Sequence, residues 1–194
     1  MPSRPVFVVT GPSGAGKGTL IKGLLGRVPG LEVAVSATTR PQRPGESDGA
    51  DYWFLSDEEF TRRAEDDDFL EWVSYVSGRR YGTLRSEIDR IGRADRICVL
   101  ELELEGALTV QRDVPGSVTI FIAADVDELE RRLRERATES TGEIEGRIDL
   151  ARVQLEQAHS FRYMVRNDDL ERATSALAAL VTCEIAATAR MTRP

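Results

Sequence analysis

The chain of 194 residues lacks an apolar run long enough for a transmembrane helix, which needs about 18 or more consecutive apolar residues. Its first apolar run, before Gly11, is only five residues long. That is too short for the apolar segment of a secretory signal peptide. We therefore expect a cytoplasmic protein without a membrane partner, and we expect this run to form a strand.

Cysteine and histidine are also scarce. Cys98 and Cys183 are too few for a disulfide framework, and we expect two buried, reduced thiols in a cytosolic protein. His159 is the only histidine, so the sequence offers no His/Cys cluster of the kind that binds zinc. It also shows no nucleophile–base pair, which argues against a covalent intermediate.

An excess of basic residues is absent as well. Lysine and arginine number 26 against 33 aspartates and glutamates, which gives a net charge of −7. Proteins that bind a nucleic-acid polymer usually carry a basic face, so we expect no such partner. A mononucleotide stays open, because backbone N–H groups and a few basic side chains can hold a phosphate. The apolar share of 41% is typical of one ordinary globular domain.

The apolar spacing predicts strands that alternate with helices. Strands are expected at 5–10, 32–36, 69–76, 96–104, 118–123 and 163–165, and helices at 17–28, 57–67, 83–91, 125–136, 140–159 and from 168 onward. This alternation is typical of an α/β protein with a parallel sheet. The expected core comprises residues 1–35, 93–135 and 148–194, with an inserted subdomain at 36–92 and a lid at 136–147.

A glycine-rich segment, GPSGAGKGT, joins the first predicted strand to the first helix, which is the context of a P-loop. Its N–H groups would surround phosphate oxygens, and its lysine would reach the β- and γ-phosphates. Gly18 stands where the strict pattern has Ser or Thr, so the group that meets Mg²⁺ stays open. The alternative is a plain turn before a helix. The candidate ATP-binding residues are Gly11, Pro12, Ser13, Gly14, Ala15, Gly16, Lys17, Gly18 and Thr19.

Three glutamates alternate with leucines at the end of the predicted strand 96–104, namely Glu101, Glu103 and Glu105. Alternation along a strand would put all three on one face. The carboxyl ends of parallel strands open into the ligand crevice, where carboxylates can hold Mg²⁺ or accept hydrogen bonds from a base. The alternative is a solvent-exposed edge. Thr19, Glu101 and Glu103 are therefore the candidate metal ligands.

Four arginines lie along the predicted helix 125–136, followed by the stretch TESTGE. Phosphoryl transfer spreads negative charge over three oxygens, and mobile arginines can close on that charge. A solvated helix face is the alternative for Arg131, Arg132 and Arg134. Farther along, Asn167 in the segment RNDD could cap the last predicted helix.

Several segments together resemble the guanylate kinase family. Residues 35–55 (VSATTRPQRPGESDGADYWFL) and 69–83 (FLEWVSYVSGRRYGT) are similar to its GMP-binding segment. The similarity continues through LELELEGA at 100–107, RRLRERATES at 131–140 and RNDD at 166–169, in the order of the family. It covers most of residues 5–181.

The resemblance implies a P-loop NTPase parallel-sheet core with helices on both faces, an inserted small GMP-binding α+β subdomain and a helical lid. It implies a Mg²⁺-dependent ATP:GMP phosphotransferase of purine metabolism, with ATP and GMP as its partners. It implies that Arg136 and Arg147 act in the lid and that Asn167 lines the adenine of ATP. The GMP-binding positions that it implies are Ser36, Arg40, Arg43, Tyr52, Glu71, Tyr81, Thr83, Glu101 and, nearby, Glu103.

The chemistry of the guanine site is consistent with the residues themselves. Guanine needs an acceptor for its N1–H and N2–H₂ edge, which Glu71 supplies, and a donor for O6, which Ser36 or Thr83 supplies. Adenine lacks that pair of donors and would leave the carboxylate partly unpaired. The alternative for Glu71 is an edge-strand charge.

The chemistry of an acceptor phosphate is also present. Arg40 and Arg43 are three residues apart in a loop, so both guanidinium groups could converge on one phosphate. Tyr52 and Tyr81 would each add a hydroxyl donor. The alternatives are solvated loop arginines and core aromatics. Because the phosphate of GMP is already ionised, no protein general base is required.

Two other functions remain open at this level. Guanylate-kinase-like domains that bind phosphoproteins share much of the acceptor pocket, and a kinase of another small phosphorylated acceptor could use the same fold. The sequence departs from the family pattern at Ala137, Glu105, Trp53 and the pair Arg79 and Arg80. The oligomeric state, the choice between GMP and its deoxy form, and the role of the tail beyond Cys183 stay open.

Overall fold

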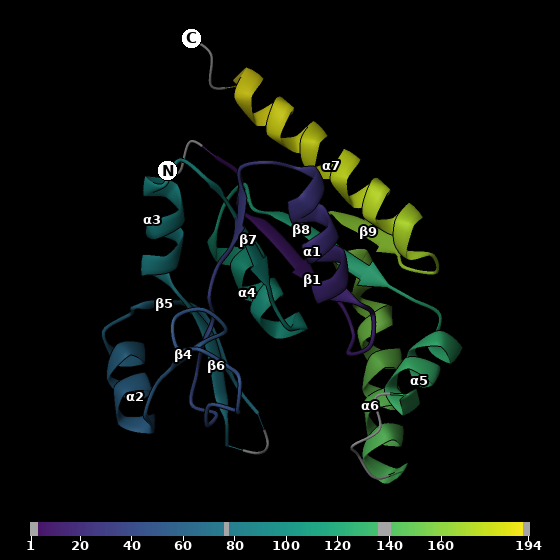
Figure 1. Ribbon diagram of the computed structural model, residues 1–194, viewed down its shortest axis with the longest axis horizontal. Helices are drawn as coiled ribbons and strands as arrows, with labels where there is room; N and C mark the ends of the chain where they lie inside the picture. The colour runs from purple at the N-terminus through teal and green to yellow at the C-terminus, as the bar shows by residue number, and fades with distance from the viewer. Residues whose placement is uncertain (1–3, 76–77, 136–140, 192–194) are drawn as a thin grey trace.

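The computed structural model describes residues 4–75, 78–135 and 141–191. Within these residues the main sheet has five strands, all parallel, in the spatial order β2–β7–β1–β8–β9 (Figure 1). Short runs of Val, Ile and Phe form these strands because a parallel sheet is covered on both faces. The strands are β1 Phe7–Thr10, β2 Leu31–Val33, β7 Ile97–Glu101, β8 Val118–Ala123 and β9 Tyr163–Arg166.

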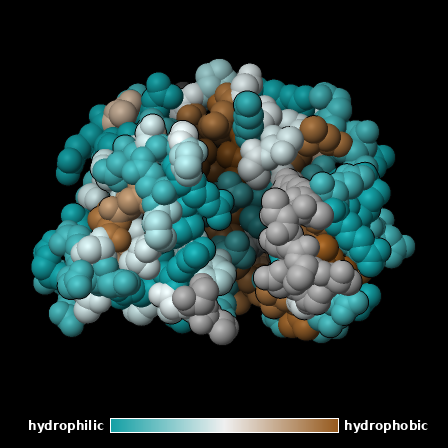
Figure 2. Space-filling model, turned by 60° about the horizontal axis from the view of Figure 1, so that its bottom comes forward, coloured by the Kyte–Doolittle hydropathy of each residue, from teal (hydrophilic) through white to brown (hydrophobic). Residues whose placement is uncertain are grey.

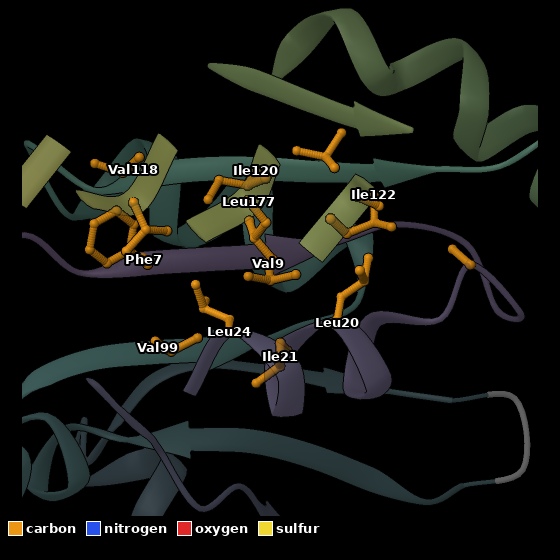
Figure 3. Packing of buried hydrophobic residues seen from close by; sticks show 14 of the residues in the cluster. Phe7, Val9, Leu20, Ile21, Leu24, Val99, Val118, Ile120, Ile122 and Leu177 are labelled. Carbon is orange, nitrogen blue, oxygen red and sulfur yellow. The ribbon is translucent and has the colours of Figure 1, made fainter. Parts of the chain in front are cut away.

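Helices cover both faces of this sheet, as expected for an α/β core. On one face, α1 and α7 pack against each other and against the strands; Figure 3 shows Val9 of β1 facing Leu20 and Leu24 of α1 and Leu177 of α7. On the other face, Val8 of β1 packs with residues of α3 and α4. The helices are α1 Lys17–Arg27, α3 Arg85–Arg93, α4 Leu104–Asp113, α5 Val126–Glu135, α6 Thr141–Glu156, the 3₁₀ helix η1 Gln157–Ser160, and α7 Leu170–Met191.

A second, mixed sheet lies within the stretch that interrupts the alternation. Its spatial order is β4–β3–β6–β5, with β3 parallel to β4 and antiparallel to β6. Its small core joins Phe60 of α2 to Phe69 of β5, whose rings stack at 4.4 Å. The elements are β3 Ala37–Thr38, β4 Trp53–Phe54, α2 Asp57–Glu65, β5 Phe69–Ser74 and β6 Arg80–Leu84.

Three sequence expectations need correction. The strand predicted over 96–104 ends at Glu101, and α4 begins at Leu104, so Glu103 and Glu105 do not continue a strand face. Alternating leucines suggested a strand, but Leu104, Ala107 and Val110 also have helical spacing, and Ala107 and Val110 are buried in the core.

The second correction concerns Thr83, where the helix predicted over 83–91 was expected to start. It belongs to β6, and Leu84 precedes α3 at the N-cap position without a side-chain cap bond. The third concerns the loop predicted over 37–52, whose first two residues, Ala37 and Thr38, form β3.

The second sheet and the α5–α6 pair extend from one end of the main sheet, at lower left and lower right in Figure 1. Figure 2 looks onto this end and shows a hollow between them with a largely hydrophilic surface. Within the described part of the chain, no helix combines the length and apolar character needed to span a membrane. The predicted lid over 136–147 falls partly outside the described residues.

Candidate active site

The glycine-rich loop leaves the carboxyl end of β1 and enters α1 at Lys17. Gly11, Gly14 and Gly16 have positive φ angles of 141°, 85° and 85°. Gly11 also touches β8, because a Cβ at this position would lie 2.2 Å from the carbonyl oxygen of Ile122. No side chain caps the first turn of α1, so its N–H groups can meet a phosphate.

Lys17 lies along this loop and faces the hollow. Its Nζ donates to the carbonyl oxygen of Gly11 at 2.7 Å. The Glu101 carboxylate is nearby, with Oε2 3.7 Å from the position of a Cβ on Gly18. The Glu101 side chain is exposed in the hollow, but neighbouring protein atoms displace part of the water around its carboxylate. This partial desolvation raises the pKa of Glu101, and the positive charge of Lys17 opposes that shift. A basic and an acidic group therefore meet beside the loop.

A cavity of about 400 Å³ connects the loop to the second sheet. It gathers residues that the sequence analysis had placed in separate motifs. The predicted residues that line it are Lys17, Ser36, Tyr52, Glu71, Tyr81, Glu101 and Glu103.

Glu71 is the most buried carboxylate of this cavity, with 6% of its surface exposed. It lies directly opposite Thr83 in the β5–β6 pair, and Thr83 Oγ1 donates to Glu71 Oε1 at 2.8 Å. Burial raises the pKa of Glu71, and the hydrogen bond from Thr83 opposes that shift. Thr83 thus directs its hydroxyl to Glu71, while Ser36 lines the cavity itself.

Arg40 is held by a glutamate that the sequence analysis missed. Two hydrogen bonds join its guanidinium group to the Glu46 carboxylate, at 2.8 and 2.9 Å, and the Arg43 N–H also donates to Glu46, at 2.8 Å. Glu46 raises the pKa of Arg40, whose guanidinium lies 5.1 Å from the ring centre of Tyr52. The signal was the short spacing of Glu46 after both arginines. One carboxylate thus organises the arginine loop.

Besides Gly82, the sequence analysis also missed three side chains that line the cavity from the β5–β6 hairpin. Val73 and Tyr75 follow Glu71 at alternate positions, and Arg79 precedes Tyr81 by two residues. Side chains two apart along a strand share a face, so strand periodicity could have identified all three. Arg79 stood out in the sequence only as a departure from the family pattern.

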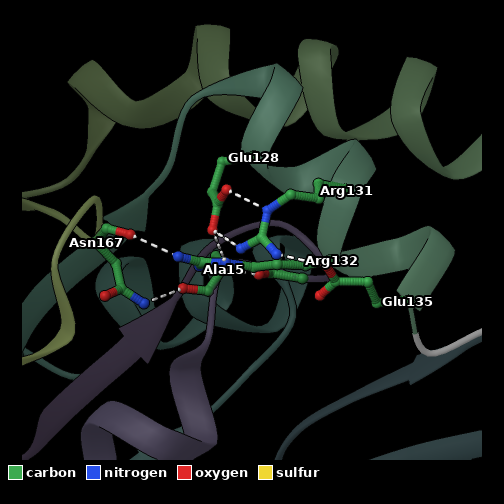
Figure 4. A network of polar contacts seen from close by, with 7 residues as sticks. Ala15, Glu128, Arg131, Arg132, Glu135 and Asn167 are labelled. Carbon is green, nitrogen blue, oxygen red and sulfur yellow. Dashed lines mark hydrogen bonds and ion pairs between the residues drawn. The ribbon is translucent and has the colours of Figure 1, made fainter.

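Arg132 of α5 contacts the other side of the glycine-rich loop (Figure 4). Its guanidinium group donates to the carbonyl oxygen of Asn167 at 3.0 Å and lies 3.4 Å from that of Gly14, while Nε donates to Glu128 at 2.7 Å. The alternative reading of a purely solvated helix face therefore does not hold for Arg132. It fits Arg131 and Arg134 better, because both are exposed and pair with glutamates of their own helix.

Asn167 is buried against the same loop. Its side-chain amide donates to the carbonyl oxygen of Ala15 at 2.7 Å, as Figure 4 shows, and its Oδ1 is buried without a hydrogen-bond partner. The alternative helix-cap role belongs to Asp169, which accepts the N–H of Arg172 at the start of α7. Asn167 thus joins the β9–α7 turn to the loop.

Of the two predicted lid arginines, Arg147 reaches the loop. It extends from α6 and hydrogen-bonds the hydroxyl of Ser13. Arg136 lies outside the described residues. A cationic group from α6 is therefore in contact with the segment predicted to bind ATP.

The residues near the loop fit a weakly held Mg²⁺. Over the described residues, no group of three or more His, Cys, Asp or Glu side chains could hold a metal ion. Mg²⁺ is usually bound through one or two carboxylates together with substrate phosphates and water. Glu101 lies beside Gly18, and Thr19 is exposed in the first turn of α1, so the chain offers ligands of this limited kind.

Comparisons with known proteins agree with this geometry. A sequence model described as guanylate kinase matches residues 3–184. The guanylate kinase of Rubrobacter xylanophilus is 46% identical over 169 residues, covering 87% of this chain and 88% of the relative. That of Symbiobacterium thermophilum is 39% identical over 194 residues, covering 98% and 92%.

A solved structure supports the fold. The crystal structure of guanylate kinase from Anaplasma phagocytophilum superimposes with a TM-score of 0.72 at 24% identity, covering 94% of this chain and 86% of that one. The family model thus spans residues 3–184, which include both the five-stranded parallel core and the glycine-rich loop with Lys17. The chain belongs to the guanylate kinase family.

Proposed function

We propose that this protein transfers the γ-phosphate of ATP to GMP and releases ADP and GDP. The observation that carries the proposal is that Lys17 of the glycine-rich loop and Glu71 of the second sheet line one cavity. A phosphate-binding lysine and a buried carboxylate suited to guanine are thereby within reach of two nucleotides bound side by side.

The second sheet would bind GMP. Glu71 would accept hydrogen bonds from N1–H and N2–H₂ of guanine, with Ser36 as the donor toward O6. Arg40, Arg43, Tyr52 and Tyr81 would hold the acceptor phosphate, and Glu101 and Glu103 would complete the acceptor side. The Arg40–Glu46 pair supports this assignment, because it fixes one guanidinium group before any ligand binds.

The transfer itself would be a direct in-line displacement. An ionised phosphate oxygen of GMP attacks the γ-phosphorus, and the bond from that phosphorus to the bridging oxygen of ADP breaks. Lys17 and the backbone N–H groups of residues 13–19 would neutralise the donor phosphates, and arginines from α6 and the predicted lid would neutralise the transferred group. Arg147 supports this role by its contact with Ser13. Asn167 and Arg132 would keep the loop in shape on the adenine side.

Mg²⁺ is proposed as the cofactor, and it would neutralise charge on the phosphates of ATP. Glu101, with Thr19 and Glu103 as further candidates, would meet it directly or through water. We further propose that residues 36–92 act as the acceptor subdomain and residues 136–147 as the lid of a cytoplasmic enzyme. Closure of these parts would exclude water, which otherwise would accept the phosphate.

The test measures ADP formation from Mg·ATP with GMP, AMP, CMP or no acceptor. We expect turnover with GMP alone, and a collapse of turnover in Lys17→Ala and Glu71→Ala. Lys22→Ala is the matched control, because this lysine is exposed five residues farther along α1 and should keep full activity. A well-folded protein without GMP-dependent turnover would overturn the proposal in favour of a binding module or another acceptor.

A further inference from the structure

Gly106 of α4 lies against the carboxylate proposed to recognise guanine. It is the third residue of that helix, and a Cβ added to it would lie 2.5 Å from Glu71 Oε2 and 3.1 Å from the carboxyl carbon. Two non-bonded atoms do not approach that closely without strain. The space that Glu71 occupies therefore exists because residue 106 has no side chain.

Neither supporting element can move away to make room for a methyl group. Ala107 and Val110 anchor α4 in the main core, where both are fully buried. On the other side, Phe69 anchors β5 by stacking on Phe60. Close-packed interiors transmit such strain rather than absorb it. The flexible end of the Glu71 side chain is thus the group that would give way.

The start of α4 also favours an anion at this point. The first turn of a helix has N–H groups without partners inside the helix, and it carries the positive end of the helix dipole. In α4 no side chain caps this turn. A glycine there allows the Glu71 carboxylate to approach the turn closely on one side while Thr83 holds it on the other.

We infer that Gly106 is a positioning residue for guanine recognition. Because it has no side chain, the Glu71 carboxylate can lie against the first turn of α4. The inference rests on the proposed function of Glu71 as the group that binds guanine. Its particular consequence is that a methyl group at position 106 impairs GMP recognition without unfolding the protein. Alanine has a higher helix propensity than glycine, so the helix itself gains from the change.

The experiment compares Gly106→Ala with Gly92→Ala in α3, where an added Cβ would have nothing within 4 Å. We expect Gly106→Ala to raise the KM for GMP and the calorimetric Kd for GMP by about tenfold or more, as when a hydrogen bond to a charged group is lost. The KM for ATP and the unfolding midpoint should stay close to those of the native protein. Gly92→Ala should leave both KM values and the Kd unchanged and, because alanine favours the helix, should keep or raise the unfolding midpoint.

A double-mutant cycle with Glu71→Asp tests the spatial argument directly. Aspartate is one methylene shorter and withdraws the carboxylate from an added methyl group. We therefore expect Glu71→Asp to weaken GMP binding strongly beside Gly106 and much less, or not at all, in the Gly106→Ala background. Independent, multiplicative effects of the two changes would overturn the inference.

The outcomes separate this inference from the proposed function. If Glu71→Ala leaves GMP binding intact, Glu71 does not bind guanine and the proposed acceptor site fails. If Glu71→Ala weakens GMP while Gly106→Ala changes its Kd less than twofold, only the positioning role fails. A loss of affinity for both nucleotides together with a lower unfolding midpoint in Gly106→Ala would show a general structural defect and overturn it too.

Discussion

The buried Glu71 carboxylate combines a functional advantage with an energetic penalty at the scale of one residue. Burial disfavours its charged form and raises its pKa, whereas two donors on guanine would require that same charged form. The proposed ligand thus stabilises the state that the free protein disfavours. This conflict makes Glu71 measurable through pH.

We expect the affinity for GMP to fall as the pH is lowered, and to do so at a higher pH than if Glu71 had the pKa of an exposed carboxylate. As pH falls through the raised pKa of Glu71, the side chain gains a proton and loses its capacity to accept both guanine donors. The phosphate of GMP also titrates, at about pH 6. The measurement is therefore the ratio of the KM for GMP in Glu71→Gln to that in the native protein, which should shrink toward unity as pH falls. A ratio independent of pH would contradict it.

The ionised Glu71 that favours GMP binding should at the same time lower the stability of the folded protein. Because the folded pKa of Glu71 is raised, the burial penalty is fully present above that pKa and disappears below the unfolded value. Glu71→Gln should therefore raise the unfolding midpoint at pH 7.5 and change it little near pH 4. Thermal unfolding at both pH values tests this, and a lower midpoint at pH 7.5 would speak against it.

The Arg40–Glu46 pair gives a second prediction at this scale. Arg40 is 6% exposed, so removing its partner leaves a buried guanidinium group without its main acceptor. We expect Glu46→Ala to destabilise the protein by about 2 kcal/mol and to raise the KM for GMP. Chemical denaturation and steady-state kinetics measure the two effects. Glu65→Ala, at an exposed glutamate in the last turn of α2, is the control and should neither destabilise the protein nor raise the KM for GMP.

At the scale of elements, helices and strands with a strong apolar periodicity could be predicted from the sequence, whereas the points at which the chain changes direction could not. The strand at 118–123 and the helices starting at Lys17 and Asp57 lie where the pattern placed them. Helix α4 as a whole was not predicted, because alternating Glu and Leu extend the strand pattern past the point where the chain turns. Local sequence cannot report that turn, since packing of Ala107 and Val110 on the main core decides it.

The same limit applied to the site. Motifs identified Lys17 and Glu71, which line the cavity, and Arg40, which packs against Tyr52 of its wall, but not the residues that hold them. Glu46 lies only three residues after Arg43, so a local pattern could have identified it. Gly106 acts through a contact between two elements, which has no fixed spacing in a sequence and is seen only in the folded chain.

The start of α2 provides a prediction for an element. Ser56 Oγ accepts the N–H of Glu59 at 3.1 Å and so caps the helix. Ser56→Ala should lower the free energy of unfolding by about 1 kcal/mol, whereas Ser56→Asp should preserve it, because aspartate caps equally well and suits the helix dipole. Urea denaturation of the three proteins is the measurement. Equal loss in both variants would count against the capping role.

At the scale of the whole molecule, Cys98 reports on opening of the main sheet. It is buried in β7, and burial raises its pKa to about 12, so the folded protein presents almost no reactive thiolate there. Cys183, which was also expected to be buried, is exposed in α7, so that expectation was wrong for this thiol. In a Cys183→Ser variant, we expect labelling of Cys98 by a thiol reagent to be slow and limited by unfolding.

Ligands should slow that labelling further. A nucleotide that binds only the folded state lowers the open population by mass action. Addition of GMP with a non-hydrolysable ATP analogue should therefore protect Cys98, and CMP is the control ligand. Rapid labelling of Cys98 in the free protein at pH 8 would contradict the buried placement.

The contact between Gly11 and β8 has a consequence for mutational tolerance. Every other amino acid carries a Cβ, and at this position that atom would meet the backbone of Ile122, which cannot rotate away as a side chain can. A saturation library should therefore return a single surviving codon family at position 11. At Gly26 and Gly92, where the added atom meets nothing within 4 Å, the same library should accept most small residues. Glycines that look alike in the sequence would thus separate into invariant and replaceable sites in one selection.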